Sequence, residues 1–175
     1  RSAELKQAEA EYREAMKLAP TDPQIHLALA DVLYRLHRYP EAIDVLQATV
    51  SLTPDNTPVY AQMAKCYAQL GRRDDALKAI ASAEQPGVKA RILLATGEAL
   101  MILGDEQGAM TRYERALESD DSERLETRLA LARFFAEEGK RDEAKQQVTY
   151  GLAEARVGEA DPVTAQTLLE TAEVL

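Results

Sequence analysis

The stretch PQIHLALADVLYRLHRYPEAIDVLQATVSLTP, residues 23–54, decides the fold of this chain. Its apolar residues recur every three or four positions in two successive runs, which is the spacing of one face of a helix. Small residues stand at Ala30 and Ala42, and large apolar ones at Leu33 and Leu46. The stretch therefore predicts two amphipathic helices, A and B, joined by a tight turn, with small side chains where the helices cross.

The rest of the chain repeats this pattern. Small residues of helix B recur at Ala8, Ala42, Ala76, Ala109 and Ala144, followed by large ones at Tyr12, Leu46, Ile80, Tyr113 and Val148. Small residues of helix A recur at Ala30, Ala64, Gly97 and Ala132, and turn residues at His37, Gly71, Gly104 and Gly139. The turn residue always precedes the next alanine by five positions (37 to 42, for example), whereas the links between repeats vary by one residue. This regularity predicts rigid hairpins joined by adjustable loops.

The repeat divides the chain into units. We expect one solenoid domain over residues 1–175, with a half unit at 1–20, full units at 23–56, 57–89, 90–124 and 125–157, and helix A of a further unit, or a capping helix, at 161–175. Both ends then fall inside a unit, which predicts a segment of a longer array.

Composition narrows the class of partner. Charged residues make up 29% of the chain and hydrophobic residues 46%, and the net charge is −9. Such an acidic surface disfavours nucleic acid and anionic membranes as partners. The chain contains no apolar run of about 18 residues, so no membrane insertion is expected. A soluble protein of the cytoplasm is the first expectation, with the periplasm as the alternative, and the richness in Ala, Arg and Glu is typical of a bacterial source.

Local signals give further expectations. Asp22 and Thr57 each precede a proline and should cap helices, as should Asp161. His37 should adopt the left-handed conformation that glycine takes in the other turns. Thr96 and Arg128 replace apolar packing residues, so their units should be the softest of the array.

The whole pattern resembles the tetratricopeptide repeat (TPR) family. The best matches in one unit are Leu29, Ala30, Leu33, Ala42, Leu46 and Pro54, and in the next Tyr60, Ala64, Tyr67, Gly71, Ala76, Ile80 and Ala83. Thr49 and Gly151 depart from the usual alanine late in helix B. The resemblance implies an all-α fold, a right-handed superhelical α-solenoid of helix-turn-helix repeats with helix A lining the concave side.

The resemblance also implies a partner-binding groove. Carried over to this chain, its positions are Leu27, Asp31, Tyr34, Arg35, Lys65, Gln69, Arg91, Leu94, Glu98, Met101 and Arg133. Ala61 and Ala68 should be exposed beside them. The lysine and asparagine clamp with which some TPR domains hold a chaperone's terminal carboxylate is absent, and Asp31 would repel such a group.

Catalytic chemistry has little support in the sequence. His26 and His37, the two histidines, fall at a packing position and in a turn, and neither has a nucleophile or a metal ligand at useful spacing. Cys66 lies inside helix A and is interpreted as a buried, inert thiol. No metal site and no cofactor are expected, and the chain is predicted not to be an enzyme.

Three functions remain open at this point. The first is a scaffold whose concave groove binds a peptide or helix of a partner protein. The second is an assembly subunit that self-associates through exposed solenoid ends or anchors a larger bacterial complex, for example of the envelope or of polysaccharide export. The third is the accessory arm of an enzyme whose catalytic part lies outside these residues.

Overall fold

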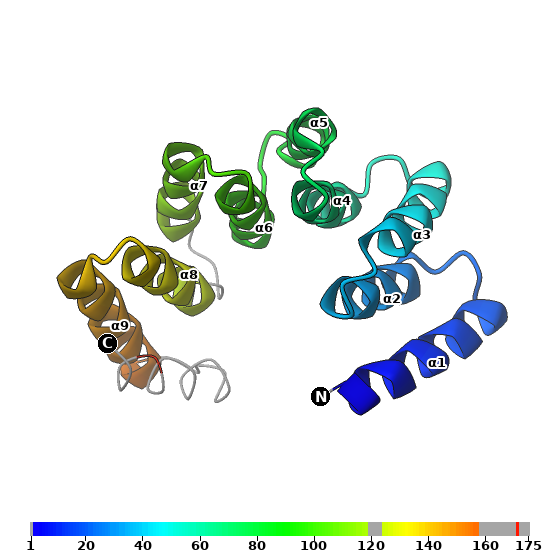
Figure 1. Cartoon of the computed structure of the whole chain (residues 1–175), viewed down its shortest axis with the longest axis horizontal. Helices are drawn as coiled ribbons and strands as arrows, with labels where there is room; N and C mark the ends of the chain where they lie inside the picture. Colours follow the sequence, from blue (N-terminus) through cyan, green and yellow to red (C-terminus); the bar gives the residue numbers. More distant parts are fainter. Residues whose placement is uncertain (1, 119–123, 158–170, 172–175) are drawn as a thin grey trace. The chain divides into compact units, whose positions relative to one another are not determined.

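The computed structural model describes residues 2–118 and 124–157 together with Thr171, and within them the chain is entirely helical (Figure 1). The helices are α1 (Ser2–Leu18), α2 (Pro23–Arg35), α3 (Tyr39–Leu52), α4 (Thr57–Gln69), α5 (Arg73–Ala83), α6 (Ala90–Ile102), α7 (Glu106–Glu118), α8 (Arg124–Glu137) and α9 (Arg141–Val157). The all-α fold predicted from the sequence is thus confirmed for this part of the chain. The expected helix at 161–175 and the cap at Asp161 lie outside the described residues, except for Thr171.

The described residues form two compact units. The first takes residues 1–88 and 98–106, and the second takes residues 89–97 and those from 107 onward. In the first unit α1 packs on α2, α2 on α3, α3 on α4, and α4 on α5, and α2 also contacts α4. In the second unit α8 packs on α9. The pairs α2–α3, α4–α5 and α8–α9 therefore form hairpins, as the repeat predicts, and the proposed unit boundaries stay a prediction.

The turns inside the hairpins share one geometry. His37, Gly71, Gly104 and Gly139 all have φ between 60° and 75°. At the first turn the N–H of His37 donates to the Tyr34 carbonyl and the N–H of Arg38 to the Leu33 carbonyl, both at 2.9 Å. The same pair of bonds closes the other three turns. The left-handed conformation predicted for His37 is confirmed, and its ring Nδ1 lies 2.7 Å from the Tyr39 hydroxyl.

Two of the helices begin close to the prolines that predicted their first turns, and one predicted cap is displaced by one residue. Asp22 caps α2, because its carboxylate accepts from the N–H of Gln24 at 2.9 Å and Pro23 opens the helix. The cap predicted at Thr57 is wrong by one residue, since Thr57 is already helical and Asn56 occupies the cap position without a side-chain hydrogen bond. Proline tolerates either of the first helical positions because neither needs its N–H.

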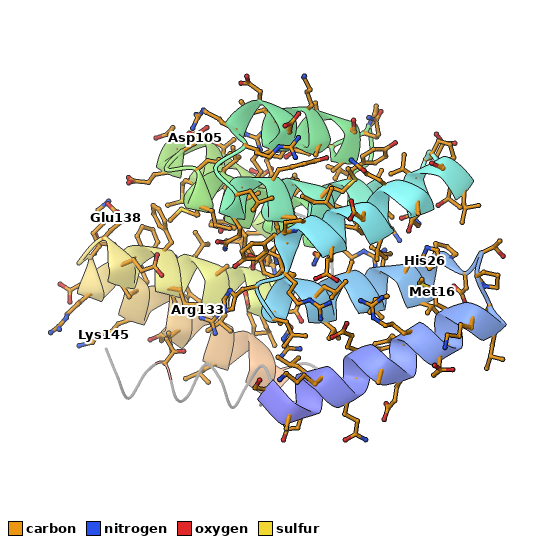
Figure 2. The ribbon with its side chains drawn as sticks, turned by 45° about the vertical axis from the view of Figure 1, so that its right-hand side comes forward. Met16, His26, Asp105, Arg133, Glu138 and Lys145 are labelled. Carbon is orange, nitrogen blue, oxygen red and sulfur yellow. The ribbon has the colours of Figure 1, made fainter. Side chains whose placement is uncertain are left out.

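Small residues allow the two helices of each hairpin to approach closely. The helix B alanines Ala42, Ala76, Ala109 and Ala144 are 0% exposed. Helix α1 differs, because none of its residues is buried and its Ala8 and Tyr12 are only half-buried. In Figure 2, α1 carries Met16 beside the helix that carries His26, consistent with the packing of α1 on α2. An ion pair at 2.6 Å between Glu9 and Arg38 also holds α1 to the first hairpin.

The polar residue Thr49, which replaces the usual alanine, is compensated inside the first hairpin. Its hydroxyl donates to the Val45 carbonyl at 2.8 Å and lies 2.9 Å from Nδ1 of His26. Because the hydroxyl hydrogen is committed to the carbonyl, His26 must donate from Nδ1. His26 and Thr49 are both buried, so this hydrogen bond links α2 to α3 through a core position.

Arg128 does not leave a gap in the last described hairpin. Its guanidinium donates to both carboxylate oxygens of Glu154, at 3.3 and 3.0 Å, and to the side chain of Gln147 at 2.9 Å. It also lies 5.1 Å from the centre of the Tyr150 ring. Thr96, the other residue expected to soften its unit, is fully buried and donates to the Leu93 carbonyl at 3.2 Å. Both side chains are thus hydrogen-bonded, and the softness expected of their units stays a prediction.

Candidate docking face on the first helices of the hairpins

Two of the predicted groove residues of the first unit, Tyr34 and Glu98, contact Lys65. The Lys65 ammonium lies 2.7 Å from a carboxylate oxygen of Glu98 and 5.0 Å from the centre of the Tyr34 ring. These residues come from α4, α6 and α2, so one lysine connects three helices. Burial alone would lower the pKa of Lys65, but the charge and hydrogen bond of Glu98, with Tyr34 and Asp31, outweigh it and raise that pKa. Lys65 therefore stays charged at neutral pH.

Tyr34 is held by two further contacts. Its hydroxyl accepts a hydrogen bond from the Gln69 amide at 3.1 Å, and its ring lies 5.3 Å from that of Tyr39 at an interplanar angle of 60°. Such tilted pairs are favourable contacts between aromatic rings. A ring fixed on both sides presents a defined apolar surface, which is what a docking residue needs.

The charged groups of this face differ in their access to solvent. The Lys65 side chain is 18% exposed, whereas those of Glu98, Asp31 and Arg35 are 40%, 51% and 62% exposed. Asp31 and Arg35 are 3.8 Å apart, a loose pair that solvent screens. The carboxylates of Asp31 and Glu98 and the guanidinium of Arg35 are therefore the charged groups of this face that solvent reaches most easily.

The apolar positions are less open than the sequence suggests. Leu27 and Met101 are half-buried. Ala61 and Ala68 are 2% and 4% exposed, so the expectation that they lie open in the groove is wrong. The physical reason is that α2 packs against α4 as well as against its own hairpin partner, which covers the small side chains of α4.

In the second unit the predicted groove residues make no such contacts with one another. Arg91 and Arg133 are exposed and Leu94 is half-buried. Arg91 and Leu94 lie on α6 and Arg133 lies on α8, and the structure shows no ion pair or hydrogen bond between these three side chains. The contacts among the predicted groove residues that are described above therefore lie within the first unit.

One feature of the face escaped the sequence-based prediction, although its signal was present. The residue that follows each small helix A residue alternates in charge along the chain: Asp31, Lys65, Glu98, Arg133. Aligning the repeats on their small residues would have shown this alternation. In the first unit it produces the Lys65–Glu98 pair and the influence of Asp31 on Lys65.

The remaining reactive groups do not assemble into a reaction centre in the part of the chain that the structure describes. Cys66 is fully buried, and this burial raises the pKa of its thiol to about 12. No three His, Cys, Asp or Glu side chains among the described residues are placed to hold a metal ion. The described helices are also too short or too polar to cross a bilayer.

These stacked helical hairpins define an α-helical repeat protein. The sequence profile described as "Tetratricopeptide repeat" matches residues 2–55 and 37–95, which together span more than half of the chain, and the chain belongs to this family. Members of the family are generally non-catalytic scaffolds for contacts between proteins.

Comparison with characterised proteins gives one relative that spans most of this chain. Cellulose synthase operon protein C of Pseudomonas fluorescens (strain SBW25) is 28% identical over 165 residues, which cover 89% of this chain. The chain spans only 13% of the length of that relative.

Solved structures share the fold. A thermophilic TPR protein of Thermus thermophilus, TTC0263, superimposes with a TM-score of 0.76, at 24% identity, over 95% of this chain and 90% of that one. YrrB, described as a TPR protein with an unusual peptide-binding site, gives a TM-score of 0.52 at 20% identity, over 93% of this chain and 80% of that one. At these identities the likeness concerns the fold.

Proposed function

We propose that the chain is a non-catalytic scaffold that binds a peptide or a helix of a partner protein on its helix A face. The proposed docking residues of the first unit are Leu27, Asp31, Tyr34, Arg35, Lys65, Gln69, Glu98 and Met101. Arg91, Leu94 and Arg133 of the second unit form a separate proposed set. The observation that carries this proposal is the arrangement of Tyr34, Lys65 and Glu98, which brings side chains of three successive A helices onto one face. Peptide binding by a protein of the same fold supports it.

The electrostatics of the face suit a particular kind of segment. Lys65 is matched by Glu98 within the protein, so its charge is not available to hold an acidic ligand. The Asp31 carboxylate, which is 51% exposed and only loosely paired with Arg35, instead favours a segment with apolar side chains and a basic residue. Tyr34 and Met101 would supply the apolar contacts.

A peptide selection tests this proposal. Peptides selected from a displayed library on the whole chain would be measured by fluorescence anisotropy against Met101→Glu and against the matched control Leu77→Glu, which places a charge on an exposed leucine of a B helix. We expect Met101→Glu to weaken binding by about tenfold or more, as burying an unpaired charge does. Equal binding to both variants, with helicity intact, would place the docking face elsewhere.

A second function is favoured by the relative from the cellulose synthase operon, which matches this chain along most of its length. In this alternative, the chain is part of an assembly subunit in a bacterial envelope or polysaccharide-export system and associates with copies of itself. The exposed leucines at the ends of B helices, Leu18 at 88% and Leu52 at 49%, would contribute to that contact.

Light scattering across protein concentration tests the alternative. A mass that rises with concentration, and that Leu18→Glu returns to the monomer value, would support self-association. A mass that stays monomeric from micromolar to millimolar concentration would exclude it and leave the peptide scaffold as the function of this region.

A further inference from the structure

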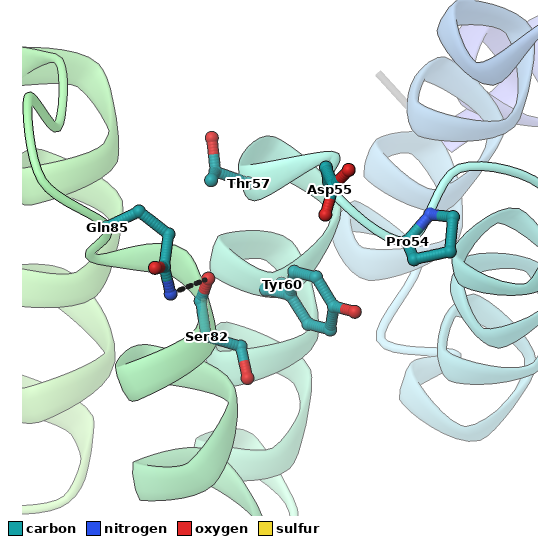
Figure 3. A pocket seen from close by; sticks show the side chains of 6 residues that line it. All are labelled: Pro54, Asp55, Thr57, Tyr60, Ser82 and Gln85. Atoms are coloured by element: carbon teal, nitrogen blue, oxygen red, sulfur yellow. Dashed lines mark hydrogen bonds between the residues drawn. The ribbon is translucent and has the colours of Figure 1, made fainter.

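A recess lies in the first unit and shares no lining residue with the docking face. It has a volume of about 280 Å³ and is lined by Pro54, Asp55, Thr57, Tyr60, Ser82 and Gln85 (Figure 3). These residues come from the loop between α3 and α4, the first turns of α4, the end of α5 and the loop that follows α5. None of them belongs to the predicted groove set. The recess is therefore a separate candidate site, smaller than the roughly 300–1,000 Å³ typical of drug-sized ligands.

The polar groups of the recess can accept hydrogen bonds. The side chains of Asp55, Thr57, Tyr60 and Ser82 have no hydrogen-bond or ion-pair partner among the residues that the structure describes. Asp55 is acidic, and no lysine or arginine lines the recess. Most charged groups of the docking face are paired, so the free carboxylate here is a distinct feature.

Gln85 adds a further hydrogen-bond acceptor to the recess. Its amide nitrogen donates to the carbonyls of Ala81 and Ser82, both at 3.3 Å, at the end of α5. The donor end of the side chain is thereby engaged within the protein, which leaves its carbonyl oxygen as the group that can bind a ligand. Tyr60 adds the face of an aromatic ring, which attracts cations.

We propose that this recess binds the guanidinium group of an arginine side chain from a partner protein. A guanidinium is planar and carries five N–H donors, so it can bind the Asp55 carboxylate, reach acceptors on several walls and stack on the Tyr60 ring at once. An ammonium is a compact point charge and satisfies fewer of these groups together. The acidic net charge of the chain favours the approach of such a partner.

The probe for this site is N-acetyl-arginine amide, added to the full chain labelled with ¹⁵N. We expect saturable shifts in the amide signals of residues 55–60 and 82–85, and N-acetyl-lysine amide should bind several-fold more weakly, about fivefold. Asp55→Asn should weaken arginine binding about tenfold, because it removes a charge-assisted hydrogen bond. Asp142→Asn, at an exposed aspartate on α9 of the second unit, is the matched control and should leave arginine binding unchanged.

Three outcomes would overturn the proposal: no saturable shift at these amides, equal binding of the lysine and arginine probes, or equal loss of binding with Asp142→Asn and Asp55→Asn. Asp55 is exposed, so its substitution is not expected to disturb folding. Tyr60→Phe gives a second check, since it keeps the ring face and should retain most of the affinity. The peptide selection on the docking face has its own readout, so either proposal can fail without the other.

Discussion

The contact between Gly97 and Tyr113 shows that a large side chain on helix B requires a small residue at the facing position of helix A. A Cβ atom at Gly97 would lie 2.6 Å from Cε1 of the Tyr113 ring, which is 2% exposed. Hairpins with a smaller helix B residue, such as Leu46, carry alanine at the position equivalent to Gly97, for example Ala30. The glycine thus makes room for the larger ring.

Gly97→Ala should lower the free energy of unfolding by about 1–3 kcal/mol through overpacking, although alanine favours helices by about 1 kcal/mol over glycine. In the background Tyr113→Leu, which restores the Ala30–Leu46 combination, the same change should become neutral or stabilising. Urea unfolding of the unchanged protein, the two single variants and the double variant measures the coupling free energy between positions 97 and 113. Equal costs in both backgrounds would contradict the steric explanation.

At the scale of the element, the turns show which features the sequence predicts well. The alignment of His37 with three glycines predicts its left-handed conformation correctly, since the constraint is local and identical in every hairpin. The predicted exposure of Ala61 and Ala68 is wrong, because it depends on packing between α2 and α4 of different hairpins. The contacts of Lys65 escape prediction for the same reason. A repeat pattern fixes the geometry within a hairpin better than the contacts between hairpins.

The α8–α9 hairpin carries a prediction on pH. The hydrogen bond from Arg128, with the charges of Arg128 and Arg124, lowers the pKa of Glu154 below 4.5 despite partial burial. A lowered folded-state pKa stabilises the protein above the unfolded-state pKa, and this contribution is lost as the pH falls through the folded value. Glu154→Gln should therefore cost about 1 kcal/mol at pH 7, and progressively less below pH about 4.5.

Urea unfolding of Glu154→Gln and of the unchanged protein between pH 3 and pH 7 measures this difference. Glu137→Gln, an exposed carboxylate on α8, is the control and should show little difference at either pH. A cost for Glu154→Gln that stays constant down to pH 3 would mean that Arg128 is held by packing on Tyr150 rather than by the charge of Glu154.

The repeat architecture predicts how far the effect of a destabilising substitution extends along the chain. Each hairpin of a solenoid is stabilised by its neighbours, so destabilisation should decay along the chain rather than affect every helix equally. Leu46 is 0% exposed on α3 and Val148 is 2% exposed on α9, and each fills the same position in its hairpin. Leu46→Ala should cost about 2–5 kcal/mol locally.

Hydrogen exchange measured by mass spectrometry distinguishes local destabilisation around the substituted residue from unfolding of the whole chain. We expect Leu46→Ala to speed exchange in α2, α3 and α4 while α8 and α9 keep most of their protection, and Val148→Ala to reverse this pattern. Each variant is the control for the other, because both enlarge the same kind of core site. If either substitution speeds exchange equally in all helices, the chain unfolds as one cooperative body, and its stability is not the sum of hairpins and their interfaces that the repeat implies.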